Sequence, residues 1–290
     1  MKFSLALVVG LIGLGAAFVL NRFKLESDEV HPWPPQDKME VPQDTLVSLC
    51  FSLSRHNSVA SRAYDSPVTL LTLATQGPDG FTKQWTNAQG YKIFSVFYPT
   101  TVKKPKGILL LLHGHGVHVI FEFMKSSGVG VERKYDKSWI QELNKQGYSC
   151  CGMDVQSKGR SEGYGGMRSY FDSFDDVVND ELDFISKLPE LGGKAFTDLP
   201  IFPFAVSMGG ARAVKMILRE ESLFKAALFY APMLSLERVS KRGLNPYMRP
   251  LTKLVNFLGP TWRLVKGSTN AMFPDLQDEF NNDRFSDSGM

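Results

Sequence analysis

The sequence has few cysteines, and their spacing forms no recognisable framework. The 290-residue chain contains three, Cys50, Cys150 and Cys151. Neither the paired spacings of a disulfide scaffold nor those of a zinc site are present. The adjacent pair lies in an apolar, strand-like run, where a free cysteine packs as a small hydrophobic residue. We therefore expect all three thiols to be structural, and we expect no metal ion and no cofactor.

The chain also lacks a large excess of charge of one sign. Lys and Arg number 33 and Asp and Glu number 30, which gives a formal net charge of +3. Basic residues are interspersed with acidic ones, so no basic stripe of the kind that follows a phosphate backbone is formed. The sequence argues against a nucleic-acid partner, and it gives no indication of the oligomeric state.

A long apolar run is present at the N-terminus, where only Ser4 interrupts the stretch from Phe3 to Leu20. A secretory signal fits, because Lys2 precedes the run and Gly15-Ala16-Ala17 offers a small-residue cleavage site. A membrane anchor fits as well, since about 17 apolar residues reach the lower limit for crossing the hydrocarbon. The length of the run favours the anchor. In both cases we expect a membrane-associated protein or one in the secretory pathway.

The rest of the chain is typical of an α/β fold. Strand-like and helical patterns alternate at the spacing of βαβ units, which predicts a mostly parallel central sheet flanked by helices. Expected strands are 68–74, 91–98, 107–112, 148–153, 199–206 and 225–231, and expected helices are 135–146, 174–188, 208–220 and 247–258. The first two strands read as a hairpin-like pair across the turn at 76–80.

Composition divides the chain into four segments. A polar, proline-bearing stretch reads as a linker or wrapping segment, and beyond residue 232 the alternation of strands and helices is lost. The expected segments are a signal or anchor (1–24), a linker (25–66), the α/β core (67–232) and a partial helical cap with a polar tail (233–290).

Ser207 marks a sharp junction between a strand and a helix. The apolar run 199–206 ends at this serine, Gly209 and Gly210 follow, and a helical pattern begins. A strand, a tight turn and a helix around one serine form a nucleophile elbow, in which the hydroxyl stands clear of the sheet. Ala205 replaces the first glycine of G-x-S-x-G, and it adds only a methyl group. A serine that merely fills a tight turn is the alternative interpretation.

Three motifs then occur in an order that resembles one family. They are L-L-L-L-H-G-H-G-V-H at 109–118, D-V-Q-S-K-G-R-S-E-G at 154–163 and A-V-S-M-G-G at 205–210. With F-D-D-V-V-N-D at 174–180, they resemble the α/β-hydrolases of the monoacylglycerol lipase and lysophospholipase group, also labelled serine aminopeptidase-like or "hydrolase 4" domains. The family's loop reads D-x-x-G-H-G-x-S-x-G, and Ser157-Lys158-Gly159 keeps only part of its centre.

The resemblance implies roles for three residues. Ser207 would be the nucleophile that forms an acyl-enzyme. The main-chain N–H groups of Met208 and His115 would form the oxyanion hole. These assignments concern the backbone at the latter two positions, so their side chains are free to vary.

Other residues of the motifs are expected to be structural. We expect His113 to be a hydrogen-bonded structural histidine and His118 to form part of a pocket wall. Asp154 and Ser161 match positions that shape the loop in the family. For both residues we nevertheless favour the simpler interpretation, a solvated turn.

The acid and the base of a catalytic triad are missing from the sequence as written. In such hydrolases the chain order is Ser, then Asp or Glu, then His. The histidines are His31, His56, His113, His115 and His118, and none follows Ser207. The family's last strands are also missing. Either the chain is a C-terminally truncated esterase, which we favour because the nucleophile and oxyanion motifs are complete, or it is a degenerate member that binds lipid or a partner.

The resemblance implies small carboxylic esters as substrates, of the monoacylglycerol or lysophospholipid type. The region beyond residue 232 is rich in apolar residues suited to an acyl-chain tunnel, and the N-terminal run would bring the domain to a membrane surface. The alternative for the cap is a small helical core of its own. The apolar residues are Met233, Leu234, Leu236, Leu254, Val255, Phe257 and Leu258.

Overall fold

The computed structural model describes residues 75, 77–237, 241, 274–283, 285 and 286. The chain divides into two compact units, residues 1–49 with 235–258 and residues 50–234 with 259–290, and every element named below belongs to the second. Its strands are β1 (Phe81–Thr86), β2 (Lys92–Tyr98), β3 (Gly107–Leu112), β4 (Tyr148–Met153), β5 (Ile201–Val206) and β6 (Leu228–Tyr230). Its α-helices are α3 (Val119–Phe123), α4 (Trp139–Lys145), α5 (Phe174–Ser186), α6 (Leu188–Gly192), α7 (Met208–Arg219) and α10 (Pro274–Asn282).

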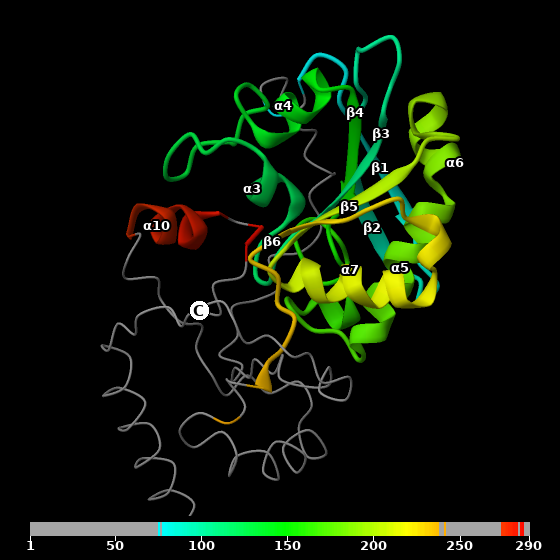
Figure 1. Cartoon of the computed structure of the whole chain (residues 1–290). Helices are drawn as coiled ribbons and strands as arrows, with labels where there is room; N and C mark the ends of the chain where they lie inside the picture. The colour runs from blue at the N-terminus through cyan, green and yellow to red at the C-terminus, as the bar shows by residue number, and fades with distance from the viewer. Residues whose placement is uncertain (1–74, 76, 238–240, 242–273, 284, 287–290) are drawn as a thin grey trace, which may run out of the picture. The chain divides into compact units, whose positions relative to one another are not determined.

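The strands form one sheet in the order β1-β2-β4-β3-β5-β6. β1 and β2 are antiparallel to each other and β2 is antiparallel to β4, whereas β4, β3, β5 and β6 run parallel. Helices α5, α6 and α7 lie on one side of the sheet, and α3 and α4 lie on the other (Figure 1). The predicted mostly parallel α/β architecture is therefore confirmed.

Successive side chains along a strand point to opposite faces of the sheet, so an apolar core forms on each face. In β3, Ile108, Leu110 and Leu112 pack with residues of α5 and α7. Leu109 and Leu111 point to the other face and pack with residues of α3 and α4. All six residues of this strand are buried, which is why it reads as one continuous apolar run.

The first hairpin differs from its prediction. β2 pairs with β1, a strand that the sequence pattern did not indicate, rather than with 68–74, a segment outside the described residues. The Asn87 side chain closes the turn by accepting hydrogen bonds from the N–H groups of Gln89 and Tyr91. This local bonding favours a short hairpin over a longer connection.

Three of the described α-helices, α3, α6 and α10, were not predicted, and some predicted boundaries move. The first helix expected after β3 starts at Trp139 rather than Tyr135, because the Ser138 hydroxyl accepts a hydrogen bond from the Gln141 N–H and caps the helix there. The strand expected at 225–231 is reduced to the three residues of β6. The predicted helix at 247–258 lies outside the described residues.

The segment predicted to be a polar tail contains α10, which docks on the core through two acidic side chains. Glu279 accepts hydrogen bonds from Arg133 (2.8 Å) and Ser126. Asp283, just beyond the helix, pairs with His118 at 3.0 Å. Burial alone would raise the pKa of Asp283, but its contacts with His118 outweigh that effect and lower the pKa to about 2.

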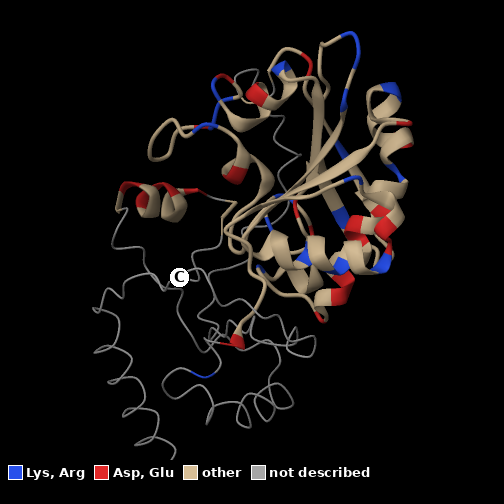
Figure 2. Ribbon diagram, viewed as in Figure 1, with Lys and Arg blue, Asp and Glu red and all other residues tan. Residues whose placement is uncertain are grey.

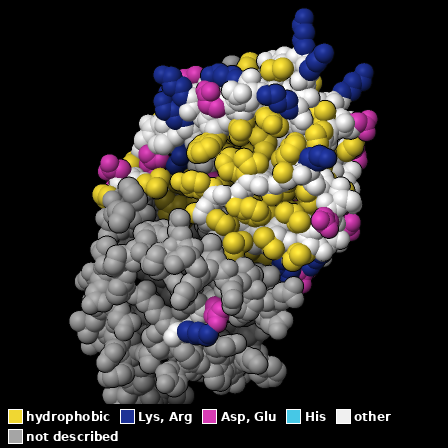
Figure 3. Space-filling view, viewed as in Figure 1, with side chains coloured by type: hydrophobic (Ala, Val, Ile, Leu, Met, Phe, Trp, Pro, Cys, Tyr) yellow, Lys and Arg dark blue, Asp and Glu magenta, His cyan; other side chains and the backbone are white. Residues whose placement is uncertain are grey.

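The surface of this unit has both charged and apolar areas. Oppositely charged side chains lie along the outer faces of α5 and α7 (Figure 2), where Asp175 bonds with both Lys215 and Arg219. Over β5, β6 and α7 the surface is largely apolar (Figure 3). Among the described residues no strand pairs with the outer edge of β6, and Tyr230 on that strand is 60% exposed.

Two further expectations concern the thiols and the membrane. Cys150 and Cys151 are buried and unbonded to each other, and burial raises the pKa of both thiols, as expected for structural cysteines. Cys50 lies outside the described residues.

In the part of the chain that the structure describes, no helix is long and apolar enough to cross a membrane. The apolar run 3–20 is not in that part.

A close approach between α7 and β3 fixes the centre of the fold. A Cβ atom at Gly209, in the first turn of α7, would lie 2.2 Å from the carbonyl oxygen of Leu112 at the end of β3. Such a contact is with backbone, which cannot move without displacing the strand. Glycine is therefore required where the helix meets the sheet.

We predict that Gly209→Ala lowers the free energy of unfolding by about 3 kcal/mol, because overpacking against backbone forces the helix away from the strand. The melting temperature should fall by about 6 to 12 °C in a thermal scan followed by circular dichroism. Gly165→Ala is the matched control, because its added methyl group meets open space at a left-handed residue (φ +55) and should cost only about 1 kcal/mol. Equal losses in both variants would contradict the close approach.

We predict that the contacts of the Asp283 carboxylate contribute about 2 kcal/mol at neutral pH, as follows from a pKa lowered from 3.8 to about 2. A depressed carboxyl pKa stabilises the fold above its unfolded value, and this contribution is lost as the pH falls from about 4 to about 2. Urea unfolding at several pH values should show Asp283→Asn less stable at pH 6 and equal to the parent near pH 2. Asp278→Asn, an exposed position on α10, should stay within about 0.5 kcal/mol throughout.

Candidate functional site

Ser207 occupies a strained turn between β5 and α7. Its backbone has φ +50° and ψ −115°, a region that residues other than glycine rarely adopt. Such strain persists where surrounding contacts enforce it, and it is common at functional sites. The side chain is partly exposed and does not cap α7. The strand, sharp turn and helix predicted around this serine are all present.

Main-chain hydrogen bonds hold the turn from the side of β6. The Ser207 N–H donates to the Tyr230 carbonyl at 3.2 Å, and the Ser207 carbonyl accepts from the N–H groups of Gly210 (2.9 Å) and Met233 (2.8 Å). The next residue, Met208, is the first of α7. Because the first N–H groups of a helix have no partner within it, the Met208 N–H is available at the helix start for a ligand oxygen.

The loop after β3 is brought against Ser207. A Cβ atom built on Gly114 would lie 3.4 Å from the Ser207 Cβ and 3.2 Å from a carboxylate oxygen of Glu122. A glycine at 114 therefore permits the loop, the serine and α3 to meet at one point. This arrangement places the loop that contains His115 beside the elbow.

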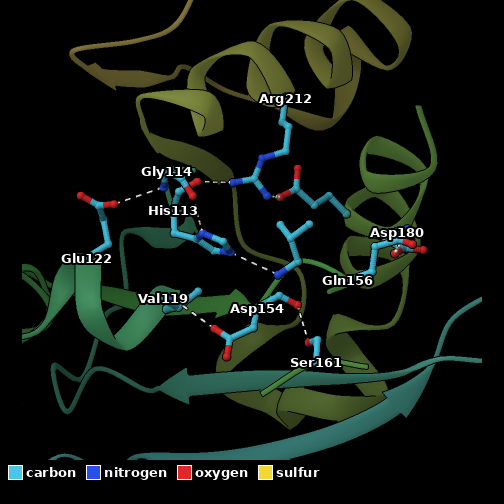
Figure 4. A network of polar contacts seen from close by, with 11 residues as sticks. His113, Gly114, Val119, Glu122, Asp154, Gln156, Ser161, Asp180 and Arg212 are labelled. Atoms are coloured by element: carbon cyan, nitrogen blue, oxygen red, sulfur yellow. Dashed lines mark hydrogen bonds and ion pairs between the residues drawn. The ribbon is translucent and has the colours of Figure 1, made fainter. Parts of the chain in front are cut away.

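The imidazole of His113 locks the loop internally. Its Nδ1 donates to the Gly114 carbonyl at 2.8 Å, and its Nε2 accepts from the Val155 N–H at 3.1 Å (Figure 4). Burial, together with the charge of Arg212, holds the His113 pKa well below its ordinary value, so the ring is neutral with the proton on Nδ1. The expectation of a hydrogen-bonded structural histidine agrees with this geometry.

Two further groups hold the peptide between His113 and Gly114. The Arg212 guanidinium, on α7, donates to the His113 carbonyl, and the Gly114 N–H donates to Glu122 at 3.1 Å. Burial raises the pKa of Glu122, although the Gly114 N–H and the charge of Arg133 act in the opposite direction. Sequence reasoning missed both Arg212 and Glu122.

Asp154 and Ser161 organise the neighbouring loop. Both are fully buried, so the solvated turn that we favoured from the sequence is wrong for this pair. The Asp154 carboxylate accepts from the N–H groups of Val119 (3.0 Å) and Arg160 (2.9 Å), and the Ser161 hydroxyl donates to the Asp154 carbonyl. These bonds tie the start of α3 to the loop after β4.

Lys158 lies where the loop departs from the family pattern. Its side chain is 1% exposed, and its Nζ lies 3.4 Å from His115 Nδ1 and 2.5 Å from the Ser169 hydroxyl. The side chain of His115 itself is exposed. A buried ammonium group thus supports the loop at the position predicted to supply an oxyanion donor.

His118 lines a cavity that does not include Ser207. The imidazole is 2% exposed, and its Nε2 lies 3.0 Å from Asp283. The cavity of about 320 Å³ lies between α3, the loop 128–133 and α10. The expectation of a wall residue agrees with this position.

No imidazole among the described residues is bonded to Ser207. His113 and His118 are engaged as described, and the Nδ1 of His115 faces Lys158. His31 and His56 lie outside the described residues. The structure therefore places Met208 and the loop that contains His115 beside Ser207, and none of the histidines in the described part of the chain is bonded to that serine.

No metal-binding cluster of His, Cys, Asp or Glu side chains occurs within the described part of the chain. The polar groups around Ser207 are backbone amides and a carboxylate that already accepts a hydrogen bond. The backbone N–H groups can stabilise an oxygen anion.

Comparison with protein families gives one match. The model of the serine aminopeptidase, S33, family (Hydrolase_4) matches residues 103–289. A comparison with curated sequences found no match.

Several solved structures are similar in fold. A soluble variant of monoglyceride lipase from Saccharomyces cerevisiae, in complex with a substrate analog, aligns with a TM-score of 0.53 and 18% identity, over 74% of this chain and 66% of that chain. A monoacylglycerol lipase from Paleococcus ferrophilus aligns with a TM-score of 0.48 and 19% identity, over 68% and 64%. A thermostable carboxyl esterase from Bacillus coagulans, in complex with glycerol, gives 0.43 and 17%, over 68% and 55%.

This chain spans about two thirds or less of the length of each of these neighbours. Its identity to them is low, so the likeness concerns the fold. The family model, in contrast, covers well over half of the chain and includes all three motifs. The chain has the α/β-hydrolase fold and belongs to the serine aminopeptidase S33 family.

Proposed function

We propose that the protein is a serine hydrolase of carboxylic esters, in which Ser207 is the nucleophile and the main-chain N–H groups of His115 and Met208 form the oxyanion hole. The strained turn at Ser207 carries the proposal, because it costs free energy and has no use in a serine that only fills a turn. Attack on the ester carbonyl would form an acyl-enzyme and release the alcohol, and water would then release the acid.

Two features support the oxyanion assignment. The Met208 N–H lies at the N-terminus of α7, where the helix dipole favours a negative charge. The Gly114 carbonyl bonds to the His113 ring, so the His115 N–H, on the opposite edge of the same trans peptide, points away from that ring. Each oxyanion-hole donor of this kind lowers the activation free energy by about 3 to 4 kcal/mol.

We further propose lipid esters, of the monoacylglycerol or lysophospholipid type, as the substrates. The yeast neighbour with the same fold is a monoglyceride lipase. The segment beyond residue 232 supplies apolar residues suited to an acyl chain, and the apolar run 3–20 would keep the domain at a membrane or in the secretory pathway. A non-catalytic lipid-binding protein is the second candidate, favoured by the engagement of every described imidazole away from Ser207.

We predict that a fluorophosphonate probe labels Ser207 slowly, because the proposed oxyanion donors would assist the attack while no imidazole among the described residues is bonded to the hydroxyl. Ester turnover should lie about a millionfold below that of an intact triad, yet above the uncatalysed rate by about 10³-fold. Intact-protein mass spectrometry would follow the adduct and locate it.

Ser207→Ala should abolish labelling, whereas Ser222→Ala, an exposed serine after α7, should leave it unchanged. A non-hydrolysable monoalkylglycerol ether should slow labelling of the parent, and free glycerol should not. Absence of any Ser207 adduct would refute the hydrolase and leave the binding protein, and labelling unaffected by the ether would refute the lipid substrate.

We predict that the full chain sediments with phosphatidylcholine vesicles and that a chain lacking residues 1–24 does not, because the apolar run would insert into the hydrocarbon. Alkaline carbonate washing should leave the full chain bound if the run spans or anchors. Equal sedimentation of the two chains would contradict the membrane assignment.

A further inference from the structure

A charged pair lies in the core behind the candidate site. Arg212 is 0% exposed and Glu181, on α5, is 1% exposed. An Arg212 nitrogen donates to Glu181 Oε1 at 2.5 Å, and a second one donates to the His113 carbonyl. Burying an ion pair generally gives little net stability compared with apolar residues of the same volume. Stability alone therefore gives no reason for this pair.

The position of the pair suggests such a reason. Arg212 lies five residues after Ser207 on α7, so it is rigidly connected to the candidate nucleophile and to the Met208 N–H. Its planar guanidinium reaches across to the loop after β3 while Glu181 holds the guanidinium in place (Figure 4). The side chain thereby links the helix of the nucleophile to the loop of the second oxyanion donor.

The contacts on that loop fix two consecutive peptide planes. The plane between His113 and Gly114 is held at its carbonyl by Arg212 and at its N–H by Glu122. The next plane, between Gly114 and His115, is held at its carbonyl by the His113 ring. Because peptide units are planar, these bonds together determine the direction of the His115 N–H.

We propose that Arg212, held by Glu181, is a positioning residue that orients the His113–Gly114 peptide and, through it, the His115 N–H of the oxyanion hole. The proposal rests on the hydrolase function proposed above. Burial raises the pKa of Glu181 to about 7, and the charge of Arg212 acts in the opposite direction.

The test uses two variants, since removing one partner of a buried pair can unfold the protein. Arg212→Met removes the bond to the His113 carbonyl but leaves Glu181 buried without its partner, which should markedly lower the melting temperature. The double variant Arg212→Met/Glu181→Leu removes both charges with side chains of similar volume and should recover stability. A thermal scan would verify that the double variant is folded.

Two readouts are needed in the full chain. The first is amide hydrogen exchange of Gly114, whose N–H loses its alignment with Glu122 if the peptide rotates; we expect exchange to accelerate about tenfold or more, with the Leu110 amide in β3 as an unchanged control. The second is fluorophosphonate labelling of Ser207, which we expect to slow by about tenfold to a hundredfold, below the cost of deleting a donor.

The outcomes separate the proposal from the function on which it rests. Fast Gly114 exchange with slow labelling in the stable double variant supports positioning. Labelling of the double variant at the parent rate, or unchanged Gly114 exchange, overturns positioning and leaves the hydrolase intact. If the parent is not labelled at all, the hydrolase fails, and Gly114 exchange still decides whether Arg212 orients the loop.

Discussion

The arrangement of the site depends on one steric constraint, the contact of the α7 N-terminus with the end of β3. The helix begins so close to the strand that a methyl group at Gly209 would overlap the Leu112 carbonyl. With this spacing, Ser207 lies at the end of β5 and the loop after β3 lies beside it. A helix displaced by even an ångström would separate the hydroxyl from the backbone donors, and such small displacements weaken catalysis strongly.

Around this contact, hydrogen bonds hold the turn at Ser207 and the two loops beside it. Bonds from β6 and the segment after it hold the backbone of Ser207, while Arg212, Glu122 and the His113 ring hold the loop. Asp154 then ties the loop after β4 to α3. Because buried polar groups cost free energy unless bonded, this network restricts the loop to few conformations. An oxyanion hole requires such rigidity, since its donors must be oriented before the charge develops.

The sequence predicted the parts that depend on local patterns. The buried strands 107–112 and 148–153 are those observed, and the junction at Ser207 is present, because continuous apolar runs and paired glycines are strong local signals. β1, α3, α6 and α10 were missed. α3 has five residues, too few for a helical period to be recognised, and α10 is polar and acquires its role from contacts with distant residues such as Arg133.

These pairs of polar side chains could not be predicted from one sequence, because their partners are far apart along the chain. Glu181 and Arg212 are 31 residues apart, and His118 and Asp283 are 165 apart. A weak signal existed, since Arg212 falls between two small residues in the first half of a core-facing helix and Glu181 interrupts the apolar stripe of α5. A charge on the apolar face of a helix indicates a buried partner, but it does not identify that partner.

The central claim is that one rigid constellation joins the Ser207 hydroxyl to two backbone donors on different elements. A crystal structure of the phosphonylated protein tests it most directly, because the phosphoryl oxygen occupies the place of the oxyanion. The account predicts that this oxygen lies within about 3.1 Å of the main-chain nitrogens of both His115 and Met208. A phosphoryl oxygen bonded to neither nitrogen, or a His115 N–H directed away from Ser207, would contradict it.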